Sequence, residues 1–205
     1  ASDVYKRQDN RNLWIHNLDI FYGNAGGDSD QVKGDGSLDC KKSKYCTFSY
    51  NHFWDSGKSC LLDASDGTGD AASDYITYHH NWFDHSDSRH PRVRNAGHVH
   101  VYNNYYDGNA KYGVGSTTGS STFVEANYFR NCKYPMMISL QGSDALGAGT
   151  FSGETGGMIK AYGNHIEGAS SFLPYSQNQS QFDCYDVSSS CLLYTSDAAD
   201  DRISV

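Results

Sequence analysis

Short segments in which β-forming side chains alternate with polar ones recur along the chain. Each segment ends near an asparagine that is followed by aromatic or aliphatic residues. The instances are LWIHNL (13–18), TFSYNHF (47–53), ITYHHNWF (76–83), VHVYNNYY (99–106), FVEANYF (123–129) and IKAYGNHI (159–166). The pattern predicts, in each repeat, a strand, a bend at the asparagine and a second strand.

The spacing of the asparagines predicts the architecture. They are Asn17, Asn51, Asn81, Asn104, Asn127 and Asn164, which lie 34, 30, 23, 23 and 37 residues apart. A period of 23, with loops inserted in the longer intervals, favours an all-β, right-handed parallel β-helix. Asparagine suits the bend because it tolerates left-handed backbone angles and can hydrogen-bond along the stack. A β-propeller has a period of about 40 residues, and a β-sandwich shares no asparagine position.

The two ends of the chain lack this repeat. Residues 1–8 (ASDVYKRQ) and 191–205 both resemble translated sequencing adapters. We therefore expect both to be non-native tails that flank a β-helix domain at residues 9–190.

Composition narrows the range of partners. The 205 residues include 16 Lys and Arg against 24 Asp and Glu, and the formal net charge of -8 disfavours nucleic acid as a partner. No apolar run approaches the roughly 18 residues of a membrane span, so we expect no membrane partner either. The six cysteines are compatible with disulfides or with buried thiols in a β core, and the sequence leaves both open.

Carboxylates gather on the glycine-rich loop after the first repeat. Asp28, Asp30, Asp35 and Asp39 lie within twelve residues. Clustered carboxylates offer hard oxygen ligands for Ca²⁺, although the spacing is not that of an EF-hand. A solvated acidic turn is the alternative.

Cations gather further along the chain. Arg89, Arg92 and Arg94 lie within six residues, and Lys58 stands on the preceding loop. Such a cluster either binds carboxylates bidentately or forms surface ion pairs with nearby aspartates. Histidines are the rival candidates for catalysis or zinc binding, but they lack zinc-site spacing with a carboxylate partner. They are His79, His80, His85, His90, His98 and His100.

Several segments, taken in order, resemble the pectate lyase family that adopts the single-stranded right-handed β-helix. They are NLWIHN (12–17), GDGSLD (34–39), TFSYNHF (47–53), DSGKSCLLDASD (55–66), ITYHHNWFDHSDSRHPRVR (76–94) and VHVYNNYYDG (99–108). The most specific part is Arg-x-Pro-x-x-Arg at residues 89–94, which follows a YHHN strand. The resemblance covers the chain from Asn12 to Gly168.

The resemblance implies a role for individual residues. Asp35 and Asp39 would be Ca²⁺ ligands, Lys58 and Arg94 would bind substrate, and Arg89 would be the catalytic base. The implied reaction is Ca²⁺-assisted β-elimination of polygalacturonate, the de-esterified form of pectin, to 4,5-unsaturated oligogalacturonates. We expect a secreted monomer. Other calcium-binding aspartates of the family precede the Trp-containing strand, so N-terminal coils are expected to be missing from this chain.

Other activities stay open at this point. A pectin lyase would act on methyl-esterified pectin without Ca²⁺. A noncatalytic β-helix would bind acidic polysaccharide, and its binding would survive the loss of Arg89. A polygalacturonase would need paired carboxylates, and the only adjacent pair, Asp200 and Asp201, lies in the expected C-terminal tail.

Overall fold

Three parallel sheets make up the computed structural model, which describes residues 5–8, 10–21, 33, 36–62, 74–138 and 157–169. Sheet A comprises β1 (Tyr5–Gln8), β4 (Leu38–Lys41), β7 (Leu61–Leu62), β10 (Arg92–Arg94), β13 (Tyr112–Thr117) and β16 (Tyr134–Ile138). Sheet B comprises β2 (Trp14–His16), β5 (Lys44–Ser49), β8 (Asp74–His79), β11 (Val99–Tyr102), β14 (Ser121–Glu125) and β17 (Met158–Tyr162). Sheet C comprises β3 (Asp19–Phe21), β6 (His52–Trp54), β9 (Trp82–Asp84), β12 (Tyr105–Asp107), β15 (Tyr128–Arg130) and β18 (His165–Glu167).

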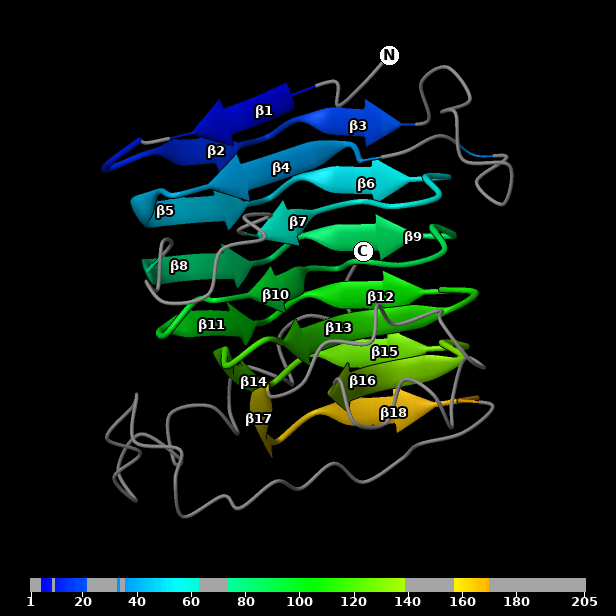
Figure 1. Cartoon of the computed structure of the whole chain (residues 1–205). Helices are drawn as coiled ribbons and strands as arrows, with labels where there is room; N and C mark the ends of the chain where they lie inside the picture. Colours follow the sequence, from blue (N-terminus) through cyan, green and yellow to red (C-terminus); the bar gives the residue numbers. More distant parts are fainter. Residues whose placement is uncertain are drawn as a thin grey trace.

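The chain visits the three sheets in turn, and each strand pairs in parallel with its counterpart one coil further on. Figure 1 shows the result as a stack of coils whose colour runs from blue at β1–β3 to yellow at β18. This arrangement confirms the predicted right-handed parallel β-helix. The part of the chain that the structure describes contains no helix able to span a membrane.

Strand β1 lies within the segment 1–8 that lacks the side-chain repeat. It pairs in parallel with β4, with Tyr5 opposite Leu38 and Gln8 opposite Lys41. Residues 5–8 therefore continue sheet A, and the expectation that residues 1–8 are a non-native tail stays a prediction. Strand pairing uses backbone N–H and C=O groups that every residue but proline has, so the missing side-chain repeat is no guide to it. The tail expected at 191–205 lies outside the described residues.

A ladder of asparagines lies at the turn between sheets B and C. The side-chain amides of Asn51, Asn81, Asn104 and Asn127 each donate to the Oδ1 atom of the asparagine one coil on, at 2.9–3.0 Å, and Asn164 ends the row. Each accepting Oδ1 also receives a backbone N–H from the preceding coil. The buried amides are thus paired along the stack, as the repeat predicts.

The first asparagine of the repeat is not part of this ladder. Asn17 has a φ of 55°, and so does Tyr50 at the equivalent place in the next coil. The ladder position of the first coil holds Leu18, whose N–H donates to Asn51 Oδ1 at 3.1 Å. The prediction that the ladder asparagine itself makes the left-handed bend is therefore wrong. The residue before it bends the chain, and the asparagine supplies the side-chain hydrogen bonds.

Aromatic rings stacked one coil apart fill the interior beside sheet C. Phe53, Phe83, Tyr106 and Phe129 form a column whose neighbouring ring centroids are 5.1, 5.0 and 4.2 Å apart. All four side chains are fully buried. Because each ring rests on the equivalent ring of the next coil, the core repeats with the period of the sequence.

The cysteines of the described residues belong to the core. Those at positions 40, 46, 60 and 132 are buried free thiols. For these four, the structure selects buried thiols over disulfides. Cys184 and Cys191 lie outside the described residues.

Candidate active site

Two residues of the predicted site, Asp39 and Arg94, lie on the outer face of sheet A. In β4, Leu38 and Cys40 belong to the core, so Asp39 between them faces outward. In β10 the core residue is Val93, which places Arg92 and Arg94 on the outer face. The sheet therefore brings one predicted metal ligand and two arginines to a single surface.

Strand register aligns part of this surface in one row. The N–H of Leu61 donates to Asp39 Oδ1 at 2.9 Å, and Leu61 pairs with Arg92. Because parallel strands lie about 4.8 Å apart, the backbones of Asp39 and Arg92 are about 10 Å apart along the stack. Both side chains are buried, at 5 % and 8 % exposure. A carboxylate and a guanidinium are thus held on either side of one leucine.

Lys58 precedes β7, from which Ser59 and Cys60 separate it. Isolated parallel bridges join it to Gly36 in the preceding coil and to Ser88 in the following one. Ser88 directly precedes Arg89, so the predicted substrate-binding lysine and the predicted base lie on adjacent coils. The structure thus brings together Lys58, Arg89, Arg94 and Asp39, whereas Asp35 lies outside the described residues, as do Asp28 and Asp30.

Arg89 occupies a bulge in the strand. Lys58 is paired with Ser88 and Leu61 with Arg92, so two residues on one coil, 59 and 60, lie opposite three on the next, 89 to 91. The extra residue is Arg89, whose φ of 66° is in the left-handed region that a side chain as large as arginine rarely adopts. A bulge of this kind redirects a side chain out of the regular alternation of the strand. The His90–Pro91 peptide bond that follows is cis.

The residues beside Arg89 are tied to both neighbouring coils. The Arg89 carbonyl accepts the Cys60 N–H at 2.7 Å, and the His90 N–H donates to the Gly113 carbonyl at 2.9 Å. A glycine is required at 113, because a Cβ there would lie 2.4 Å from the Pro135 carbonyl oxygen. The bulge is therefore held by its backbone on both sides.

Tyr112 is a neighbour of Arg89 that the sequence analysis missed. Its hydroxyl hydrogen-bonds to the side chains of Arg89 and Ser88. Burial raises the pKa of Tyr112, so the phenol stays protonated. Tyr112 comes 23 residues after Arg89, which is one coil of the repeat. The period was therefore the signal that could have found it.

The histidines do not replace Arg89 as the candidate base. His90 is fully buried, its Nδ1 lies 2.9 Å from the Tyr112 carbonyl, and burial lowers its pKa to about 4. His79 and His100 lie in sheet B, where His79 stacks on Tyr102 and His100 lies 2.7 Å from a Glu125 oxygen. These residues contribute packing and hydrogen bonds away from the outer face of sheet A.

Asp39 is suited to a hard cation. Its carboxylate is the one predicted calcium ligand among the described residues, and its Oδ1 already accepts the Leu61 N–H. That bond orients the group. Ca²⁺ takes 6 to 8 oxygen ligands as a rule, so Asp39 fits as one member of a larger set that must include other carboxylates, carbonyls or water.

A second group with metal-ligand spacing lies in sheet C. The ligand atoms of Asp84, His85 and Asp107 lie within 4.8 Å of one another, and among the described residues this is the only such group. Arg130 donates to Asp107 through Nε at 3.0 Å, and His52 Nε2 lies 3.1 Å from Asp84 Oδ2. Arg130 thus already balances the charge of Asp107, and none of the predicted calcium ligands belongs to the group.

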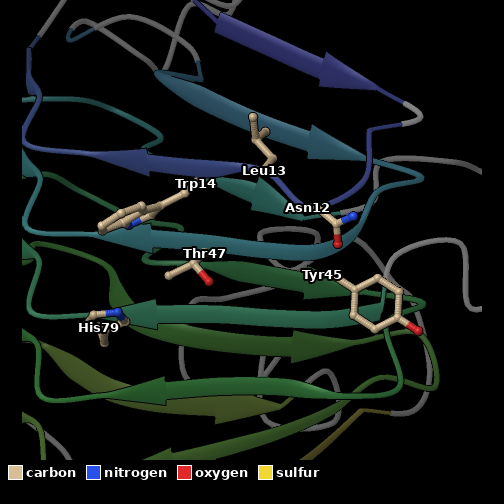
Figure 2. A pocket seen from close by; sticks show the side chains of 6 residues that line it. All are labelled: Asn12, Leu13, Trp14, Tyr45, Thr47 and His79. Carbon is tan, nitrogen blue, oxygen red and sulfur yellow. The ribbon is translucent and has the colours of Figure 1, made fainter.

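One hollow of the described surface lies elsewhere, on sheet B. It measures about 380 Å³ and is lined by Asn12, Leu13, Trp14, Tyr45, Thr47 and His79. Figure 2 shows these side chains along the strands of sheet B, with the Trp14 and Tyr45 rings lying apart from each other. None of the residues predicted for the active site lines this hollow.

The described residues form a parallel β-helix in which one lysine and three arginines lie on adjacent coils at sheet A. Comparison with known proteins identifies the family. A family model described as pectate lyase matches residues 2–201, and the chain belongs to the pectate lyase family. This confirms the resemblance seen in the sequence.

Individual relatives agree with this assignment. A pectate trisaccharide-lyase of Bacillus licheniformis is 36% identical over 128 residues, which cover 62% of this chain and 36% of the relative. A pectate lyase from Bacillus sp. N165, solved in complex with trigalacturonate, superimposes with a TM-score of 0.68 at 27% identity, over 97% of this chain and 61% of that one. Another pectate lyase structure, described with an anti β-elimination mechanism, superimposes with a TM-score of 0.61 at 25% identity, over 82% of this chain and 44% of that one. The chain thus spans about a third of the length of the curated relative.

Proposed function

We propose that this chain carries the catalytic centre of a secreted, monomeric pectate lyase that cleaves polygalacturonate by Ca²⁺-assisted β-elimination. The observation that carries the proposal is Arg89, set in a bulge between the coils of Lys58 and Tyr112, on the face that also presents Arg94 and Asp39. Family membership and the trigalacturonate bound to a related structure support the substrate class. Secretion follows from the substrate, because an extended polymer is met outside the cell.

The reaction requires that negative charge be neutralised before a proton is removed. The hydrogen on C5 of a galacturonate unit is acidic because it is adjacent to the carboxylate, and its loss leaves a dianion. Lys58 and Arg94 bind the carboxylate and stabilise this charge as it develops. Arg89 takes the C5 proton on a guanidine nitrogen. The C5–H electrons form the C4–C5 double bond, and the C4–O bond breaks toward the leaving oxygen, which then gains a proton.

Three further cations lie close to Arg89 in the stack. They are Lys58, Arg92 and Arg94. Their positive charges attract the carboxylate groups of an acidic polymer.

Calcium completes the proposed site. Asp39, with Asp35 four residues earlier in the sequence, would hold the ion together with substrate carboxylates. When bound, Ca²⁺ neutralises the carboxylate next to C5 and so lowers the cost of the dianion. Asp39 contributes a buried, oriented oxygen donor in the row that leads to Arg92.

Arg89→Lys tests this function most directly. Lysine keeps the positive charge but moves the nitrogen and lacks the planar guanidinium. We expect kcat for polygalacturonate to fall at least about 100-fold while KM changes little, because a general base acts only in the transition state. Formation of the unsaturated product is followed by ultraviolet absorbance at alkaline pH, with and without added Ca²⁺.

Arg130→Lys is the matched control, because Arg130 lies in sheet C and pairs with Asp107. It should keep the turnover of the unmodified chain. Unchanged turnover in Arg89→Lys would refute the assignment of the base. If the unmodified chain binds polygalacturonate but yields no unsaturated product, a noncatalytic binding protein is the better description. Activity that persists in excess chelator on methyl-esterified polymer would instead favour a pectin lyase.

A further inference from the structure

Tyr112 is attached to both sides of the bulge that carries Arg89. Its backbone N–H donates to the Asp87 carbonyl at 3.2 Å, and its carbonyl oxygen lies 2.9 Å from His90 Nδ1. Asp87 and His90 stand on either side of Ser88 and Arg89 in the chain. One residue of the next coil therefore spans the four residues that contain the proposed base.

Hydrogen bonding at the Tyr112 hydroxyl has a defined direction. The Ser88 hydroxyl donates its single hydrogen to the Gly57 carbonyl at 3.1 Å, within a buried environment. The Tyr112 hydroxyl is hydrogen-bonded to the side chains of both Ser88 and Arg89. Because a guanidinium has only donors, the Tyr112 oxygen accepts an N–H from Arg89. The result is a chain of hydrogen bonds from Arg89 through Tyr112 and Ser88 to Gly57, the residue before Lys58.

We propose that Tyr112 is a positioning residue that holds one guanidinium nitrogen of Arg89 as a donor and so leaves another nitrogen to take the substrate proton. The proposal rests on the function proposed above. An amino N–H is a better donor than an imino N–H, so the nitrogen bonded to Tyr112 keeps its full set of hydrogens when the guanidine loses a proton. The proton-accepting nitrogen is then one that faces the open side of sheet A.

This arrangement compensates for the bulge. A residue outside the regular alternation has no neighbouring side chain in its own row to restrict its rotamers, and an arginine has many rotamers to lose. Tyr112 is only 4 % exposed, so its ring is fixed by packing, and its hydroxyl provides a rigid anchor. Misplacement of a catalytic group by about 1 Å can cost 100-fold in rate.

The variant Tyr112→Phe removes the anchor and keeps the ring. The matched control is Tyr106→Phe, which also deletes a buried hydroxyl that bonds to the bulge segment, at 2.8 Å from the His90 carbonyl, but has no bond to Arg89. The first measurement is guanidinium NMR of ¹⁵N-arginine-labelled chain, with Arg89 assigned by the signal lost in Arg89→Lys. We expect slow rotation of the Arg89 guanidinium in the unmodified chain and in Tyr106→Phe, and fast rotation in Tyr112→Phe.

The second measurement is β-elimination of polygalacturonate at a temperature where all variants are folded. We expect Tyr112→Phe to lower kcat about tenfold or more with KM within twofold, and Tyr106→Phe to stay within threefold of the unmodified chain in both. Slow rotation retained in Tyr112→Phe, or equal kcat losses in the two variants, would overturn the proposal. If the unmodified chain forms no unsaturated product, the proposed function fails, and the NMR result still decides whether Tyr112 holds Arg89.

Discussion

Replacing Asn104 with leucine measures what the asparagine ladder contributes to stability. The Asn104 Nδ2, whose two hydrogens are shared among three acceptors, lies 3.0 Å from the Tyr78 and Tyr102 carbonyl oxygens and 2.9 Å from Asn127 Oδ1. Its Oδ1 accepts both the backbone and the side-chain N–H of Asn81, at 2.9 and 3.0 Å. Leucine has a similar volume and supplies none of these bonds.

The expected loss follows from the groups left behind. The Asn81 backbone N–H and the Tyr78 carbonyl are buried and lose their side-chain partner. An unsatisfied buried polar group costs about 1–3 kcal/mol, so two of them cost about 2–6 kcal/mol, and a net loss of about 3 kcal/mol is expected after the gain from burying leucine. For a chain of this size that lowers Tm by roughly 6–12 °C.

Asn51→Leu is the matched control at the end of the ladder. Its Oδ1 accepts the N–H of Leu18, which is 40 % exposed, so water can replace the amide there. We expect a loss of about 1 kcal/mol at this site. Urea unfolding of both variants, followed by circular dichroism at one temperature, gives the two free energies of unfolding. Equal losses, or a loss below about 1 kcal/mol for Asn104→Leu, would refute the reasoning that paired amides stabilise this turn.

Two further predictions concern charge. Because burial lowers the pKa of His90 to about 4, from an ordinary value of 6.5, the unfolded chain binds a proton at a higher pH than the folded chain. Stability is therefore retained above pH 6.5 and falls as the pH drops toward 4; His90 accounts for a loss of about 2.5 kcal/mol between pH 7.5 and 4.5. That difference should be absent in His90→Gln when urea unfolding is compared at the two pH values; an unchanged pH dependence would exclude His90 as its source. Asp39→Asn keeps an acceptor for the Leu61 N–H but removes the charge, so we expect Tm to hold while the Ca²⁺ concentration for half-maximal β-elimination rises about tenfold or more. An unchanged Ca²⁺ requirement would remove Asp39 from the metal site.

The sequence alone was sufficient to predict the architecture of this protein, and it supplied the residues of the candidate site as predictions. A spacing of 23 residues between Asn81, Asn104 and Asn127 is the length of one coil, and the ladder bonds join those same residues. Such a repeat can be recognised in the sequence because equivalent positions in every coil have the same surroundings and therefore require the same kinds of side chain. The Arg-x-Pro-x-x-Arg motif could likewise be recognised from the sequence, since its residues are close together in the chain.

Details that depend on how one coil sits on the next were decided only by the tertiary structure. Leu18 rather than Asn17 occupies the ladder position in the first coil. The left-handed residue and the ladder residue are adjacent in the chain, so the pattern of aromatic and polar residues does not show which of the two positions an asparagine occupies. Strand β1 joins sheet A through backbone groups that leave no mark in the sequence.

The surroundings of Arg89 show the same limit. The sequence identifies the arginine, but the bulge depends on the register between coils. Ser88 pairs with Lys58 and Arg92 with Leu61, and the segment from Ser88 to Arg92 is one residue longer than the segment from Lys58 to Leu61. Tyr112 reaches Arg89 because stacking places residues one period apart side by side. The local pattern determines which residues form strands, whereas the register between coils determines which side chains meet, and that register is set by packing and hydrogen bonds along the whole stack.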